Sequence, residues 1–222
     1  MKWLADRIMA HRAALLFQRV GPHLPESGVI ADIGSGTGHN AEEVRRRTAL
    51  LVREFDVADL HWVGPGPVIF NGGRVPVEDG AFDGLLLLFV MQYVDSPNEL
   101  LSEVRRISRG PVIVVQSVYR GWWGRTVLGL REFIWGRLAL RVAVALRVLP
   151  PVECPLNPQR YLTRPDLHRL FEASGLVVVK TEPAEWFGLS VSRDLFVLES
   201  RGCRVGPAAL RRAGPPSVLK RS

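Results

Sequence analysis

The sequence of 222 residues contains only two cysteines, Cys154 and Cys203, which lie far apart without metal-ligand spacing. A disulfide-stapled scaffold or a structural zinc site is therefore not indicated. We interpret both cysteines as free thiols in a reducing compartment, although their number also permits one disulfide. Histidine, aspartate and glutamate likewise form no cluster with metal-ligand spacing, so we expect no metal site.

Uninterrupted hydrophobic runs of membrane-spanning length are also missing. Four polar residues interrupt the first dozen positions, which argues against a secretory signal: Asp6, Arg7, His11 and Arg12. The most apolar later stretch, residues 126–149, contains four arginines. A central arginine costs about 2.5–3.5 kcal/mol on insertion scales, which argues against a spanning helix. We therefore expect a soluble, cytoplasmic protein.

Acidic residues are missing from the end of the chain. The net charge is +7, but residues 201–222 hold six basic residues and no acidic one, which leaves about +1 for residues 1–200. We interpret residues 201–222 as a basic, flexible tail and residues 1–200 as a single domain. Because that domain is nearly neutral, its charge does not indicate a nucleic-acid partner.

Apolar runs alternate with helical segments, which predicts an α/β fold with helices on both faces of the sheet. The seven expected strands are residues 28–33, 51–56, 67–70, 82–90, 111–117, 175–181 and 194–200. Helices are expected over the first twenty residues, from the N-cap Ser96 to Ile107, and from the N-cap Thr163 to Gly175. The last two strands follow each other without a crossover helix and should pair antiparallel. The sheet is thus predicted to be mostly parallel, with an antiparallel last strand.

Residues 118–160 interrupt this alternation with a long stretch rich in aromatic residues. We interpret it as an inserted helical cap over the carboxyl edge of the sheet. Three of its arginines share roughly a 120° arc of a helical wheel: Arg131, Arg137 and Arg141. A solvated face is the simplest explanation of that arc. Contact with a substrate anion, or a peripheral membrane contact through this region or the basic tail, is the alternative.

The strongest motif is Asp32-Ile33-Gly34-Ser35-Gly36-Thr37-Gly38, which follows the first expected strand and precedes a helical segment. Its glycines let the backbone turn sharply and approach a ligand, and the helix behind it directs amide groups toward an anionic part. A dinucleotide fingerprint would need glycine at position 39, where His39 stands. Asp32 suits a cationic amine better than a pyrophosphate. Asp56 ends the second expected strand, where a carboxylate can accept both hydroxyls of a ribose.

The motif resembles the first motif of class I S-adenosylmethionine-dependent methyltransferases, particularly the ubiquinone and menaquinone C-methyltransferases. Residues 71–83, 89–95 and 100–115 resemble the family's segments around strands four and five, so the likeness covers roughly residues 28–117. It implies a Rossmann-like sheet and S-adenosylmethionine as the cofactor. The implied cofactor-binding residues are Asp32, Gly34, Ser35, Gly36, Thr37, Gly38, Asp56, Val57, Asn71, Gly72 and Phe89.

By position in the family, Asp32 would orient the amino group of the methionine part and Asp56 would hold the ribose. Gly72 would offer a backbone amide to the adenine ring, and Phe89 would line the methionine side.

Two features depart from the family. Asn71 stands where an aspartate often meets the adenine amino group, although the amide oxygen of asparagine can still accept that bond. Residues 61–66 are too short for the usual helix between strands two and three.

Methyl transfer from a sulfonium is an in-line displacement that needs alignment more than a general base, and alignment is worth about 7–11 kcal/mol. We therefore assign no catalytic residue. We expect a small hydrophobic or aromatic metabolite as the acceptor, methylated on oxygen or carbon. The residues expected to contact it are Tyr93, Tyr119, Trp122, Trp123 and Tyr161. The alternatives are a nucleotide-dependent oxidoreductase and a protein that binds S-adenosylmethionine without transferring its methyl group.

Overall fold

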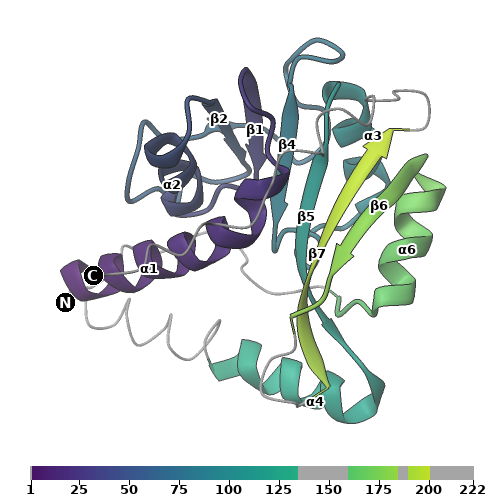
Figure 1. The fold of residues 1–222 in the computed structure, drawn as a ribbon. Helices are drawn as coiled ribbons and strands as arrows, with labels where there is room; N and C mark the ends of the chain where they lie inside the picture. Colours follow the sequence, from purple (N-terminus) through teal and green to yellow (C-terminus); the bar gives the residue numbers. More distant parts are fainter. Residues whose placement is uncertain (1, 135–159, 185–189, 201–222) are drawn as a thin grey trace, which may run out of the picture.

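The computed structural model describes residues 2–134, 160–184 and 190–200, and its centre is one β-sheet (Figure 1). The strands are β1 (Val29–Ile33), β2 (Leu51–Asp56), β3 (Val68–Ile69), β4 (Gly84–Leu88), β5 (Val112–Tyr119), β6 (Leu176–Glu182) and β7 (Val191–Ser200). Within these residues the strand order is β3-β2-β1-β4-β5-β7-β6. All seven expected strands are present, and their ends differ from the expected ones by a few residues.

Pairing directions also agree with expectation. The strands from β3 to β5 pair parallel, whereas β7 pairs antiparallel with both β5 and β6. The short connection from β6 to β7 leaves no room for a crossover helix, so the chain can only reverse. The predicted mostly parallel sheet with an antiparallel last strand is therefore confirmed.

Helices cover both faces of this sheet. They are α1 (Lys2–Val20), the short 3₁₀ helix η1 (Gly21–His23), α2 (His39–Arg47), α3 (Pro97–Ile107), α4 (Gly121–Glu132) and α6 (Arg164–Ala173). Figure 1 shows α1 and α2 on one side of the sheet and α6 on the other. Buried side chains of α1 and α2 pack with Ile30, Leu86 and Ile113, whereas those of α3 and α6 pack with Leu85 and Val114. Strands β4 and β5 are apolar on both faces for this reason.

The two predicted helix caps differ in outcome. Thr163 and Asp166 form a complete capping box at the start of α6, as predicted. Ser96 does occupy the N-cap position of α3, but its side chain makes no cap hydrogen bond. The amide of Glu99, which a capping serine would bind, instead donates to the backbone carbonyl of Ser96 at 3.1 Å. This tight first turn leaves the hydroxyl without its usual donor.

The predicted cap region is described only in part. Residues 118 and 119 belong to β5, and α4 then begins at Gly121, directly beyond the carboxyl end of that strand. Residues 135–159 of the cap and residues 201–222 of the tail lie outside the described residues, so the domain boundaries remain predictions. None of the described helices is long and apolar enough to cross a membrane.

Candidate functional site

The glycine motif forms a tight turn between β1 and α2. Gly34, Gly36 and Gly38 all have positive φ angles, of 76°, 56° and 81°, a region that side chains disfavour. A Cβ on Gly34 would lie 2.5 Å from the side chain of Val90, and one on Gly38 would lie 2.5 Å from the ring of His61. A Cβ on Gly36 would meet no atom within 4 Å. The turn is thus packed at both ends and open at its centre.

Asp56 joins this turn to the end of β2. Its carboxylate accepts hydrogen bonds from the backbone amides of Gly36, at 2.8 Å, and Val57, at 2.7 Å. Each oxygen therefore has one backbone donor and retains a lone pair for a further donor. The two bonds fix the orientation of the carboxylate beside the open centre of the turn.

Asp32 lies at the end of β1, one residue from the turn, with only 1% of its surface exposed. Neither of its carboxyl oxygens has a hydrogen-bond partner. The pKa of Asp32 is raised to about 8, mainly by burial and also by the negative charges of Glu54 and Asp56, against the opposing charge of Arg45. The acid is therefore poised to ionise when a cation comes within reach.

A buried ionic cluster that the sequence interpretation missed lies beneath the turn. Glu54, whose side chain is fully buried, pairs with Arg45 of α2 and, at 2.6 Å, with Nε2 of His61. The same nitrogen of His61 lies 3.5 Å from the hydroxyl of Ser35. One signal was readable: Glu54 stands two residues before Asp56 and therefore faces the same side of the sheet.

The connection from β2 to β3 forms no helix, as the sequence predicted, and it packs against the turn instead. The amide of Trp62 donates to the carbonyl of Thr37 at 3.1 Å, and its ring meets the ring of His39 edge-on at 6.1 Å. His39 in turn contacts the hydroxyl of Thr37 at 2.9 Å and the carboxylate of Asp6 in α1 at 3.0 Å. These contacts attach the N-terminal half of α1 to the glycine turn.

Four other predicted cofactor residues follow β2, β3 and β4, namely Val57, Asn71, Gly72 and Phe89. A Cβ on Gly72 would lie 3.4 Å from the side chain of Val57, so these two residues are neighbours. The side-chain oxygen of Asn71 accepts a bond from the amide of Gly73 at 3.1 Å and keeps its second lone pair. Phe89 has a φ of 64°, which is rare outside glycine and accompanies functional sites.

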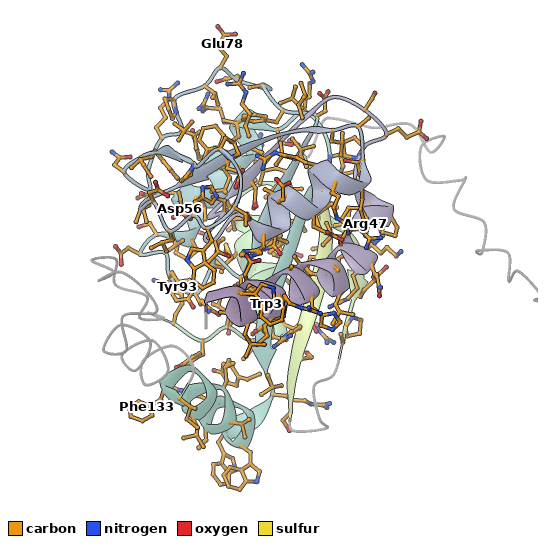
Figure 2. All side chains as sticks on the ribbon, turned by 90° about the vertical axis from the view of Figure 1, so that its left-hand side faces the viewer. Trp3, Arg47, Asp56, Glu78, Tyr93 and Phe133 are labelled. Atoms are coloured by element: carbon orange, nitrogen blue, oxygen red, sulfur yellow. The ribbon has the colours of Figure 1, made fainter. Side chains whose placement is uncertain are left out.

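The predicted substrate residues fall into two groups. Tyr119 and Tyr161 are partly buried, and the parallel bridge between Val118 and Leu162 places both segments at the end of β5. Tyr93 is also partly buried, and in the view of Figure 2 it lies between Asp56 and Phe133.

The two predicted tryptophans form the second group. Trp122 and Trp123 lie in the first turn of α4, stacked at 4.7 Å, and are 74% and 61% exposed. Such exposure does not favour an enclosed substrate pocket around them.

Metal-binding side chains are not clustered in the described parts of the chain. There, no three residues of the types His, Cys, Asp and Glu are placed so that they could hold a metal ion together.

Both the family model and the curated relatives that match this sequence are methyltransferases. Residues 5–181 match the family model of the methyltransferase domain. An uncharacterised methyltransferase from Mycobacterium leprae (strain Br4923) is 27% identical over 125 residues, which cover 52% of this chain and 46% of that protein. A protein from strain TN of the same species matches equally. The chain therefore spans about half the length of these curated relatives.

Solved structures share the fold at low identity. Geranyl diphosphate C-methyltransferase from Streptomyces coelicolor A3(2), in complex with Mg²⁺, geranyl diphosphate and S-adenosyl-L-homocysteine, aligns with a TM-score of 0.58 and 15% identity, covering 87% of this chain and 80% of that one. The [4+2]-cyclase SpnF aligns with a TM-score of 0.59 and 12% identity, covering 86% and 80%. At these identities the likeness shows the fold alone.

Proposed function

Because this chain belongs to the methyltransferase domain family, we propose that it moves the methyl group of S-adenosylmethionine onto an oxygen or carbon atom of a small hydrophobic or aromatic metabolite. The observation that carries this proposal is the carboxyl group of Asp32, which is buried without a partner beside the glycine turn. A buried carboxyl group without a partner is costly, and a cationic ligand group removes that cost. A dinucleotide pyrophosphate would bring no cationic group to the same place.

The residues around the turn fit the remaining parts of this cofactor. Asp56 is held by two backbone amides and keeps a lone pair on each oxygen, which suits two ribose hydroxyls. The open side of Gly36 lets the backbone come close to the ligand. We assign the adenine side to the neighbours Val57 and Gly72 together with Asn71. Phe89 would line the methionine side.

Bound S-adenosylmethionine would supply a methyl group on a sulfonium, with a neutral thioether as the leaving group. The chain itself has to hold the acceptor in line with that methyl group, and such alignment is worth about 7–11 kcal/mol. The ionised Asp32 and Asp56 would fix the donor side. A general base is required only for an acceptor that must lose a proton, and we assign none.

Partly buried tyrosines support an aromatic or lipophilic acceptor. Tyr119 ends β5, Tyr161 precedes the residue that bridges to this strand, and Tyr93 follows β4 at the same edge of the sheet. Ligands of open α/β sheets bind at this carboxyl edge. The similar fold from Streptomyces coelicolor A3(2) is that of an enzyme of geranyl diphosphate, an isoprenoid compound, which is consistent with a lipophilic acceptor here.

Calorimetric titration with S-adenosylmethionine, S-adenosylhomocysteine and NADH tests the cofactor. We expect saturable binding of the two sulfur compounds only. Asp56→Ala should weaken it about 10- to 100-fold, the effect of losing charged hydrogen bonds. Glu78→Ala is the matched control, because Glu78 is an exposed acid far from Asp56 in Figure 2. Binding of NADH instead, or no binding, would overturn the proposal.

A second candidate is a protein that uses the cofactor fold without methyl transfer. The similarity to a [4+2]-cyclase keeps this candidate open, because that enzyme has the same fold. Incubation with methyl-labelled S-adenosylmethionine and a panel of lipophilic phenols, enols and isoprenoid acceptors separates the two. Transfer of label to any acceptor supports the methyltransferase, whereas tight binding without transfer to the whole panel supports the second candidate.

A further inference from the structure

The outer surface of α4 is unusually apolar. Five large hydrophobic side chains in and directly after this helix are exposed by 40–74%: Trp122, Trp123, Leu130, Phe133 and Ile134. On the inner side, Leu128 is buried and Gly124 lies against the carbonyl of Ser190 beside β7. The helix is thus attached to the sheet by one side and presents aromatic and aliphatic groups on the other.

The N-terminal helix carries a second apolar stripe. Leu4, Ile8 and Leu15 are 49–55% exposed at helical spacings of four and seven residues, and Trp3 beside them is 67% exposed. In Figure 2 both helices lie on the visible side, α1 with Trp3 and α4 with Phe133. The contact between Asp6 and His39 fixes this end of α1 next to the glycine turn. Both apolar faces therefore border the carboxyl edge of the sheet.

Single exposed hydrophobic residues are ordinary, but grouped ones mark an interaction site. The charges beside these groups distinguish between partners. Arg7, Arg12 and Arg125 are exposed, whereas the only acid in α1, Asp6, is turned toward His39. A second copy of the chain would bring like charges together across this surface, whereas an anionic surface would complement them.

We propose that the exposed faces of α4 and of the N-terminal half of α1 dock on an anionic membrane surface, with their tryptophans and aliphatic side chains at the level of the lipid headgroups. Tryptophan favours that level because its ring is apolar and its N–H remains hydrated. Arginines on the flanks attract anionic headgroups, as in interfacial amphipathic helices. Docking would bring the carboxyl edge of the sheet toward the bilayer, where a lipophilic acceptor is concentrated. The inference goes beyond the proposed function and does not depend on the cofactor.

Co-sedimentation of the full-length chain with two kinds of vesicle tests this inference. We expect binding to vesicles of equal parts phosphatidylcholine and phosphatidylserine, and much weaker binding to phosphatidylcholine alone. Trp122→Gln combined with Trp123→Gln should lower the partition coefficient at least about tenfold. Arg125→Gln should lower it about fivefold on the anionic vesicles only.

Two control variants test whether vesicle binding depends on the proposed surface. Leu51→Gln removes a side chain that is 67% exposed at the opposite edge of the sheet, and it should leave partitioning unchanged. Arg211→Gln with Arg212→Gln tests the basic tail and should change partitioning less than twofold. No binding to anionic vesicles, binding that survives the tryptophan replacements, or binding lost only with the tail arginines would overturn the proposal. So would a stable dimer in lipid-free solution that the tryptophan replacements dissociate.

Discussion

The carboxyl group of Asp32 shows how one residue links stability to ligand binding. Its folded-state pKa is about 8, against an ordinary value of 3.8, mainly because burial disfavours the charged form. The folded chain therefore retains a proton that the unfolded chain releases. This group contributes stability that is fully present below about pH 4 and is lost as the pH rises through about 8.

Replacing Asp32 by asparagine should remove this loss. We expect the free energy of unfolding of Asp32→Asn, relative to the wild type, to rise between about pH 5 and about pH 8 and to level off above that pH. Urea denaturation at several pH values measures it. Glu78→Gln, an exposed acid, serves as the control and should show no such trend. A constant difference between Asp32→Asn and the wild type across this range would contradict the assigned pKa.

His61 is a second residue whose replacement should change the stability of the chain. Its ring pairs with the buried Glu54 and fills the space under Gly38. His61→Ala should cost about 1–3 kcal/mol of unfolding free energy, because it removes the ring that contacts the buried carboxylate of Glu54 and packs under Gly38. A double-mutant cycle with Glu54→Gln, followed by urea denaturation, should give a coupling free energy well above zero. His11→Ala, on the exposed face of α1, should stay within about 0.5 kcal/mol of the wild type.

At the scale of elements, the N-cap residues Ser96 of α3 and Thr163 of α6 provide a matched pair of alanine variants. Thr163→Ala should destabilise the chain by about 0.5–2 kcal/mol, since the Thr163 side chain accepts from the backbone amide of Asp166 at the start of α6. Ser96→Ala should cost much less, because the Ser96 hydroxyl makes no cap bond. Thermal unfolding of both variants tests this contrast. Equal losses would mean that Ser96 caps α3 in solution.

The glycine turn allows a similar contrast between folding and binding. Gly36→Ala should cost only about 1–2 kcal/mol for its left-handed φ, because nothing lies near the added methyl group. It should nevertheless weaken cofactor binding strongly. Gly38→Ala should destabilise more, since overpacking against the backbone carbonyl of Val63 and the ring of His61 adds about 1–3 kcal/mol. Urea denaturation and calorimetry on both variants separate the two effects, and a Gly36→Ala variant with normal binding would contradict the site.

Features that are determined by neighbouring residues in the sequence were predictable. The apolar runs fixed where the strands lie, and the Thr163 capping box marked the start of α6. The absent β2–β3 helix followed from the shortness of residues 61–66. Features that depend on contacts between distant segments were missed. The pairing of His61 with Glu54 belongs to this class, because it depends on how the connection after β2 folds back against that strand. The unused hydroxyl of Ser96 has a local cause instead, the tight first turn of α3, which the spacing of residue types does not reveal.

At the scale of the whole molecule, connection lengths decided the topology. The short β6–β7 link forced an antiparallel pair, and the crossovers through α2, α3 and α6 placed helices on both faces. These rules brought Asp32, the glycine turn and Asp56 to one edge of the sheet, as expected. The outward face of α4 was not predictable, because spacing alone does not show which side of a helix meets the sheet.

The central claim is that Asp32 receives the ammonium group of S-adenosylmethionine at this edge. Calorimetric titration of the wild type at about pH 6.5, in two buffers that differ in ionisation enthalpy, tests it most directly. Below its pKa of about 8 the acid is protonated. The account therefore predicts saturable binding with nearly one proton released per molecule bound. Asp32→Asn should bind about 10- to 100-fold more weakly and release none. Binding of the wild type without proton release, or no saturable binding, would contradict the account.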